Sequence, residues 1–161
     1  MSETIAARQV FSLYEATHSI EKAIANRYQQ SYWIKAEMNK LNLYHHSGHC
    51  YPDLVEKRDG KLIAQLRAIL WRTDYEHINR RFLEVLKEPL KYGIKILFLA
   101  RIQFHSVHGL SLQIMDIDPN FTLGDLEQEK QETIKKLHTE GVIKQNKTRK
   151  LALVPQRIAI I

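Results

Sequence analysis

Two groups of residues have the types and spacing needed to hold a single-stranded nucleic acid. Such binding needs cations near the phosphates and exposed rings on which bases stack, each stacked base contributing roughly 1 to 3 kcal/mol. Trp71 and Arg72 adjoin at the end of an expected strand, where the ring could stack a base and the guanidinium could hold the next phosphate. The candidates on or beside strands are Lys35, Asn39, Lys40, Arg67, Trp71 and Arg72. The alternatives are a barrel-closing core position for Trp71 and an ordinary solvated surface position for the arginines.

The second group lies in the loop that joins the first two expected strands. A hydroxyl and a glycine amide can donate to phosphate there, histidines can stack or donate, and a tyrosine can face the groove. The candidates are His46, Ser47, Gly48, His49 and Tyr51.

The same loop offers two competing kinds of chemistry, and both are weak. A metal site would crowd its ligands into six positions, with no second cluster to complete a tetrahedron; these ligands would be His45, His46, His49 and Cys50. Nucleophilic use of Cys50 lacks an activating partner. No phosphate-binding loop, dinucleotide fingerprint or carboxylate pair with metal-site spacing is present. We therefore assign no catalytic residue, no metal ligand and no cofactor.

The elements that must position these residues can be inferred from apolar spacing. A helix is expected over 11–30, with Ser12 as N-cap and Glu15 three residues on. Its apolar stripe comprises Leu13, Thr17, Ile20, Ile24 and Tyr28. From Tyr32 onward polar and apolar residues alternate, as in a half-buried strand. Trp33 opens that strand beneath the helix, and we expect it in the core.

The remaining pattern predicts four more strands and two more helices. A turn at 58–60 predicts a hairpin. The later strands are expected at 49–56, 61–71, 94–104 and 109–117, and the later helices at 74–88 and, after Pro119, from Phe121 to about Gly141. Five antiparallel strands with a helix between the third and fourth is the order of an OB-fold, a barrel that binds oligonucleotides. The predicted class is mainly β, with flanking helices: a five-stranded OB-fold barrel after an N-terminal helix and before a connector helix.

Composition favours a globular nucleic-acid-binding chain. The 161 residues are 44% hydrophobic, enough for one core. Lys and Arg number 24 against 18 acidic residues, a formal charge of +6 that favours an acidic partner, although charge for solubility alone is the plain alternative. A single cysteine indicates a reducing, cytoplasmic setting. No targeting signal or membrane span is visible, so no membrane partner is expected.

The C-terminal residues LALVPQRIAII end inside an apolar run. We expect this run to begin a further domain, although it could instead complete the barrel's own sheet. The expected layout is an N-terminal helix at 1–30, the OB-fold at 31–120, a connector helix and basic linker at 121–155, and the first strand of a truncated catalytic domain at 156–161.

Several stretches resemble the exodeoxyribonuclease VII large subunit along essentially the whole chain. They are SLYEATHSIEKAI, WIKAEMNKL, HHSGHCYPDL, LRAILWR, GLSLQIMDIDP and LHTEGVI followed by VPQRIAII. The resemblance implies an N-terminal OB-fold in a nuclease that degrades single-stranded DNA from both ends to short oligonucleotides. It also implies a small helical partner subunit, bound through regions absent from this chain, as are the catalytic residues. Pro52 departs from the family pattern and would remove a hydrogen bond from the second strand.

The sequence therefore favours a module that binds single-stranded DNA and cleaves nothing by itself. One alternative is an assembly element that docks onto the nuclease complex through its helices. The other is an RNA-binding OB-fold of the anticodon-binding type, which would use 2′-hydroxyl contacts.

Overall fold

The computed structural model describes residues 3–5 and 8–145. The chain divides into two units, Met1–Asp125 and Leu126–Ile161, and each is described by itself. The expected strand at 156–161 and most of the expected basic linker lie outside the described residues. The expected domain bounds therefore remain predictions.

The first helix begins where its capping signal predicts. In α1 (Leu13–Arg27) the Glu15 amide donates to Ser12 Oγ at 3.1 Å, and the Ser12 amide donates to Glu15 Oε2 at 2.9 Å. This reciprocal pair satisfies two amides that a helix start leaves open. Before it, β1 (Glu3–Ile5) and β2 (Arg8–Val10) form an antiparallel pair in a region where no strand was predicted.

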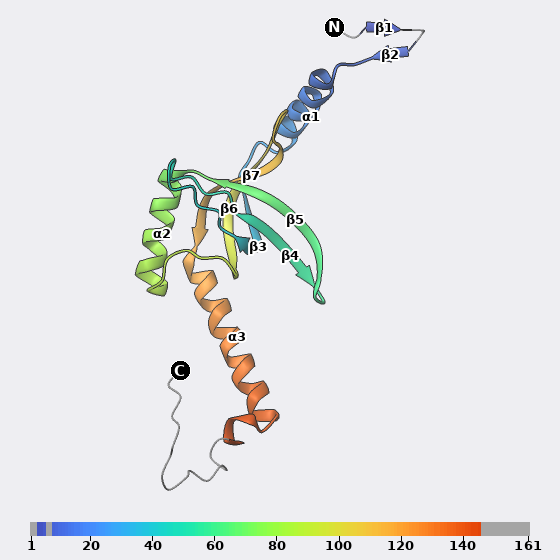
Figure 1. Ribbon diagram of the computed structural model, residues 1–161. Coiled ribbons are helices and arrows are strands. Elements are labelled where there is room, and N and C mark those ends of the chain that lie inside the picture. Colours follow the sequence, from blue (N-terminus) through green and yellow to red (C-terminus); the bar gives the residue numbers. More distant parts are fainter. Residues whose placement is uncertain (1–2, 6–7, 146–161) are drawn as a thin grey trace, which may run out of the picture. The chain divides into compact units, whose positions relative to one another are not determined.

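Five strands form a closed barrel, which confirms the predicted OB-fold (Figure 1). The barrel strands are β3 (Tyr32–Lys40), β4 (Asp53–Arg58), β5 (Lys61–Leu70), β6 (Ile94–His105) and β7 (Gly109–Asp118), in the order β3-β4-β5-β7-β6. The expectation of antiparallel pairing throughout is wrong at one place, because β5 and β7 run parallel. Parallel strands need a long crossover, and α2 with β6 supplies it.

The second strand starts later than predicted, and Pro52 is the reason. β4 begins at Asp53, immediately after this buried proline. Having no amide proton, Pro52 takes part only through its carbonyl, which accepts from the Ala68 amide at 2.8 Å. The β4–β5 turn is as predicted, with Asp59 and Gly60 both at positive φ, 51° and 74°.

The core lies between the barrel strands and α2 (Arg72–Leu86), which carries Ile78 and Phe82 into it. The large side chains that are almost fully enclosed include Met38, Leu70, Ile78, Phe82, Ile96, Phe98, Ile114 and Ile117. Trp33 is not among them. It is 54% exposed, so its expected core position is wrong. The alternation along β3 puts Trp33 on the same outward face as Lys35, and that alternation overrides its apolar character.

The barrel is less tightly filled at the β4–β5 hairpin. In the part of the chain that the structure describes, the strand residues within 56–64 pair only with one another, and Figure 1 shows the hairpin extending beyond the other strands. An apolar cavity of about 610 Å³ lies behind it, with Ile24 of α1 and Tyr28, the residue just after that helix, among its lining residues. The α1 stripe is thus only partly used, because Leu13 is 82% exposed.

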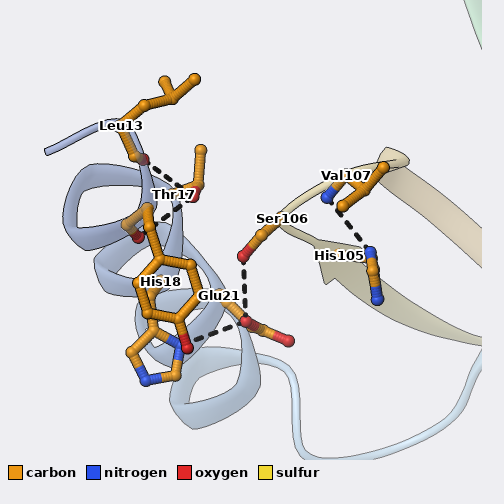
Figure 2. Close-up of polar contacts among 8 residues, drawn as sticks. Leu13, Thr17, His18, Glu21, His105, Ser106 and Val107 are labelled. Carbon is orange, nitrogen blue, oxygen red and sulfur yellow. Dashed lines mark hydrogen bonds and ion pairs between the residues drawn. The ribbon is translucent and has the colours of Figure 1, made fainter.

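Helix α1 is joined to the β6–β7 turn by one hydrogen bond, drawn in Figure 2 with the polar contacts around it. Ser106 Oγ donates to Glu21 Oε2 at 3.4 Å, and His18 Nδ1 lies 3.2 Å from the same oxygen. Thr17 Oγ1 donates to the Leu13 carbonyl at 2.9 Å within the helix. Of these three contacts, the Ser106–Glu21 bond is the one that links the helix to the barrel, and no residue of α1 is buried.

The last long helix, α3 (Pro119–Thr139), follows β7 directly. Its first turns belong to the barrel unit, because buried Thr122 donates to the Lys95 carbonyl at 3.0 Å and Asp125 pairs with Lys95 at 3.2 Å. In the second unit the helix ends before Gly141, whose φ is 70°, and a short 3-10 turn, η1 (Val142–Lys144), follows. None of the helices in the described ranges has the length and apolarity to span a membrane.

Candidate nucleic-acid interface

A groove of about 790 Å³ runs over the outer face of β5, between the loop at 41–52 and the β6–β7 turn. We call it the β5 groove. Five of the predicted site residues line it: Lys40, Ser47, Tyr51, Arg67 and Trp71. These are the two loops and the strand face that OB-folds use for oligonucleotides.

Alternation along β5 produces the floor of the groove. Ala68 and Leu70 point inward and are fully buried, whereas Arg67 and Ile69 point to the other face and line the groove. Trp71 continues that outer face as the residue between β5 and α2, and it is 38% exposed. A strand of period two therefore presents a cation, an aliphatic side chain and an indole in succession.

The cations of the groove are grouped around one carboxylate. Asp53 is the register partner of both Lys40 on β3 and Arg67 on β5. Arg67 Nε lies 3.6 Å from Asp53 Oδ1, while the arginine side chain stays 73% exposed. Such an exposed pair adds little stability, but it restrains the guanidinium beside the groove. With two cations and one anion, this cluster favours an anionic ligand.

The rings of the groove are held edge to face. Tyr44 and Tyr51 contact each other with centroids 5.3 Å apart and planes at 86°. The His49 ring meets Trp71 at 4.9 Å and 85°. Because the indole and both tyrosines remain beside open space, they offer surfaces on which bases could stack.

The loop at 41–52 is tied to the barrel by its own backbone. Cys50 and Leu70 exchange two amide–carbonyl bonds, both 2.9 Å. Tyr44 closes the loop, donating to the His49 carbonyl at 2.9 Å and accepting from the Gly48 amide at 2.7 Å. Asn42 Nδ2 donates to the Tyr51 carbonyl at 2.9 Å. The groove wall is therefore an ordered loop with fixed ends.

The structure separates six predicted residues from the groove lining. Two belong to β3: the Lys35 ammonium lies 5.1 Å from the Phe121 ring centroid, and Asn39 sits at a bulge between Met38 and Lys40. The bulge adds one residue, so Lys40 rather than Asn39 reaches the groove.

The other four lie in or against the loop. His46 is exposed at its surface. Gly48 packs on the Arg72 side chain, His49 Nδ1 accepts from the Arg72 amide at 3.2 Å, and Arg72 Nε pairs with Glu76 at 2.8 Å. His49 and Arg72 therefore adjoin the groove through Trp71 without lining it.

The structure also brings in residues outside the predicted set, and these are Asn42, Tyr44, Asp53, Ile69, His108, Leu110 and Ser111. The alternation of β5 could have indicated Ile69. The connection between the strands expected at 94–104 and 109–117 could have indicated the far wall, because OB-folds use that turn as well. Asp53 gave no signal, because its position depends on where β4 starts.

The chemistry of Cys50 follows from its burial. The side chain is fully enclosed, and burial raises the pKa of the thiol to about 11. The thiol therefore stays protonated and unreactive at neutral pH. Across the described ranges, no group of three or more His, Cys, Asp or Glu side chains is placed to hold a metal ion.

Comparison with known proteins agrees with this geometry. The family described as OB-fold nucleic acid binding domain matches residues 11–118. An exodeoxyribonuclease 7 large subunit from Deinococcus radiodurans is 28% identical over 123 residues, which cover 73% of this chain and 29% of that protein. The same subunit from a Chelativorans species is 23% identical over 152 residues, covering 94% of this chain and 26% of that protein.

One solved structure, a mitochondrial single-stranded DNA binding protein from S. cerevisiae, is 15% identical with a TM-score of 0.37. That likeness covers 55% of this chain and 90% of the other. This chain spans less than a third of the length of the curated relatives it matches. From the match over 11–118 and the closed barrel, we conclude that the chain belongs to the OB-fold nucleic acid binding domain family and resembles the exodeoxyribonuclease 7 large subunit.

Proposed function

We propose that the β5 groove binds single-stranded DNA and delivers it to a nuclease of the exodeoxyribonuclease VII kind. One observation carries the proposal: the cations Lys40 and Arg67 share a single groove with the rings of Trp71, Tyr44 and Tyr51. Phosphates lie near Lys40 and Arg67, and bases stack on the rings. Because every base has a π-face, binding of this kind has little sequence preference.

Fluorescence anisotropy with a labelled oligothymidine tests the groove. With two phosphate contacts, the logarithm of the binding constant should fall with the logarithm of salt with a slope of about −1.4, from about −0.7 per contact on a single strand. Absence of salt-sensitive binding at low ionic strength would reject the proposal. Lys22→Gln on α1 is the matched control, since it removes one exposed charge outside the groove.

The preference for DNA is a finer part of the proposal. Competition between DNA and RNA oligonucleotides of equal length and sequence measures it directly. An RNA that displaces the labelled DNA at lower concentration would replace DNA with RNA as the ligand and would indicate 2′-hydroxyl contacts.

In this proposal the nuclease activity belongs to a full-length large subunit of the exodeoxyribonuclease VII kind. This chain by itself binds single-stranded DNA without cutting it. The protein should release no acid-soluble oligonucleotide from single-stranded DNA, with or without divalent cations. Release of oligonucleotides by the purified chain above the level in a buffer control would overturn this part of the proposal. Partnership with the small subunit is proposed for the larger subunit on the same resemblance.

A second role as an assembly element is favoured by one observation on α1. Its stripe is exposed at Leu13 and Ile20, so an apolar helix face remains uncovered within the described residues. Analytical ultracentrifugation of the chain, alone and with the small subunit of a related nuclease, distinguishes the roles. A complex that forms with the wild-type chain and is lost in Leu13→Ser would support docking. A chain that stays monomeric both alone and with the small subunit would reject it.

A further inference from the structure

We propose that His49 is a positioning residue: it fixes the indole of Trp71 for base stacking and does not itself contact the nucleic acid. This inference rests on the proposed role of the β5 groove. It assigns to His49 a task different from the direct contact that the loop sequence suggested. Three contacts place His49 in this role, at the point where the loop at 41–52 meets the start of α2.

The first contact is an unusual helix cap. Trp71 occupies the N-cap position of α2, and its side chain makes no capping hydrogen bond. The first amides of a helix have no partner within it, and they are normally satisfied by a short polar side chain at the N-cap. Here the Arg72 amide donates instead to His49 Nδ1 at 3.2 Å, across 23 positions of the chain. His49 thus caps the helix from a distant loop.

The second contact is between the rings. The imidazole of His49 meets the indole of Trp71 at 4.9 Å with planes at 85°, an edge-to-face pair. His49 therefore touches both the ring of Trp71 and the backbone amide that follows it. This one half-buried side chain therefore restrains the indole in two ways, through the backbone next to Trp71 and through the ring itself.

The third contact keeps His49 in place. Gly48, with φ at 73°, lies so close to the Arg72 side chain that a Cβ would come within 2.8 Å of Cδ and 2.9 Å of Cγ. Arg72 is itself held by Glu76 at 2.8 Å. The successive loop residues Gly48 and His49 thus both contact Arg72, the first residue of α2, so the loop and the start of the helix are held together.

The chemistry sets the form of the imidazole. An acceptor at Nδ1 requires the neutral ring with its proton on Nε2. An asparagine at this position can supply an equivalent acceptor, because its Oδ1 is attached to Cγ just as Nδ1 is. His49→Asn is therefore the conservative variant, and His49→Ala removes both the cap and the ring.

A double-mutant cycle on oligothymidine binding tests the positioning role. His49→Ala should weaken binding about three- to tenfold, less than removal of the stacking ring itself. In a Trp71→Ala background the same change should have no further effect, because its target is gone. His49→Asn should recover most of the lost affinity, and His45→Ala, in the same loop, should bind as wild type. Additive losses would mean that His49 touches the nucleic acid directly, and no loss at all would also overturn the proposal.

A measurement without nucleic acid keeps the two proposals distinguishable. Trp33→Phe leaves Trp71 as the chain's sole tryptophan. In that background, His49→Ala should increase acrylamide quenching and lower the anisotropy of the indole emission, and His49→Asn should partly reverse both. Circular dichroism verifies that each variant is folded. If His49→Ala unfolds, the quenching and emission anisotropy of His49→Asn are compared with those of the wild type, and that comparison decides whether His49 positions the indole. Unchanged emission in the folded variants rejects positioning, whereas a protein that shows the emission changes but binds no oligonucleotide rejects only the proposed function.

Discussion

The inner and outer faces of β5 differ both in burial and in the kind of side chain that they present. Inward-pointing Ala68 and Leu70 are fully enclosed, while Arg67 and Ile69 on the opposite face border an open groove, which Trp71 extends. The same stretch of chain thus serves packing with one set of side chains and ligand contact with the other. Stability and binding should therefore respond to different, adjacent substitutions.

The outer face can remain open because its ordering comes from outside the core. Arg67 is restrained by Asp53, and Trp71 is contacted by His49. These contacts come from β4 and from the loop at 41–52. The inner face needs no such help, because close packing alone fixes its side chains.

The largest effect is expected on the inner face. Leu70→Ala should lower the free energy of unfolding by about 2 to 5 kcal/mol, through lost burial and a residual cavity. Urea unfolding followed by circular dichroism measures it. The folded fraction should bind oligothymidine as wild type does. A loss under about 1 kcal/mol would show that the inner face is not what holds the barrel together.

The next effect belongs to the outer face. Trp71→Ala should weaken oligothymidine binding by about 1 to 3 kcal/mol, with a smaller loss of stability than Leu70→Ala. Trp33→Ala is the matched control, because that tryptophan is also exposed but lies outside the groove. Equal losses of affinity in the two variants would mean that Trp71 has no special role.

A smaller effect is expected from the cation beside Trp71. Arg67→Gln should make the salt dependence of binding shallower by about 0.7 in logarithmic slope, the share of one phosphate. Anisotropy titrations over a range of sodium chloride concentrations give the slope. Lys22→Gln should leave it unchanged, and an unchanged slope in Arg67→Gln would place this arginine away from the phosphates.

The smallest effect is the pH dependence of stability that comes from Cys50, and it is absent at neutral pH. The backbone of Cys50 pairs with that of Leu70. Burial raises the pKa of this thiol from about 9 to about 11, so the unfolded chain loses the proton first as pH rises. Stability is therefore full below about pH 9 and falls as pH approaches 11. Above pH 9 the free energy of unfolding of the wild type should fall relative to that of Cys50→Ala, as denaturation curves across this range would show. Parallel curves would show that the thiol is not sequestered.

Local signals in the sequence predicted much of the fold, because each depends on neighbouring residues. Ser12 and Glu15 form the capping box that their spacing predicts, and Asp59 with Gly60 makes the expected turn. The five strands and the helix between the third and fourth were also predicted, and with them the barrel. Pairing direction was not predictable in the same way, because the parallel contact of β5 with β7 is a property of barrel closure.

The groove was predicted less completely, because its membership depends on register. A single bulge between Met38 and Lys40 exchanges which polar side chain of β3 reaches the groove. Trp33 was expected in the core because it opens a strand beneath the first helix, although the alternation around it indicated the outer face. The loop histidines could be recognised as suited to nucleic acid, but only the three-dimensional contact with Arg72 distinguishes His49 from His46.

The parallel pairing of β5 with β7 has a consequence for how the chain folds. Ala68 finds its partner at Leu112 only after α2 and β6, which lie between them, have taken their places. The β4–β5 and β6–β7 hairpins are local and can form early. The parallel β5–β7 pairing, which we call the seam, joins distant positions and contributes no stabilising free energy until the intervening chain is ordered. We expect the seam to close last and to set a folding time of milliseconds to seconds. Until then the edges of β5 and β7 are unpaired, so in slow refolding this seam is where two chains would exchange strands.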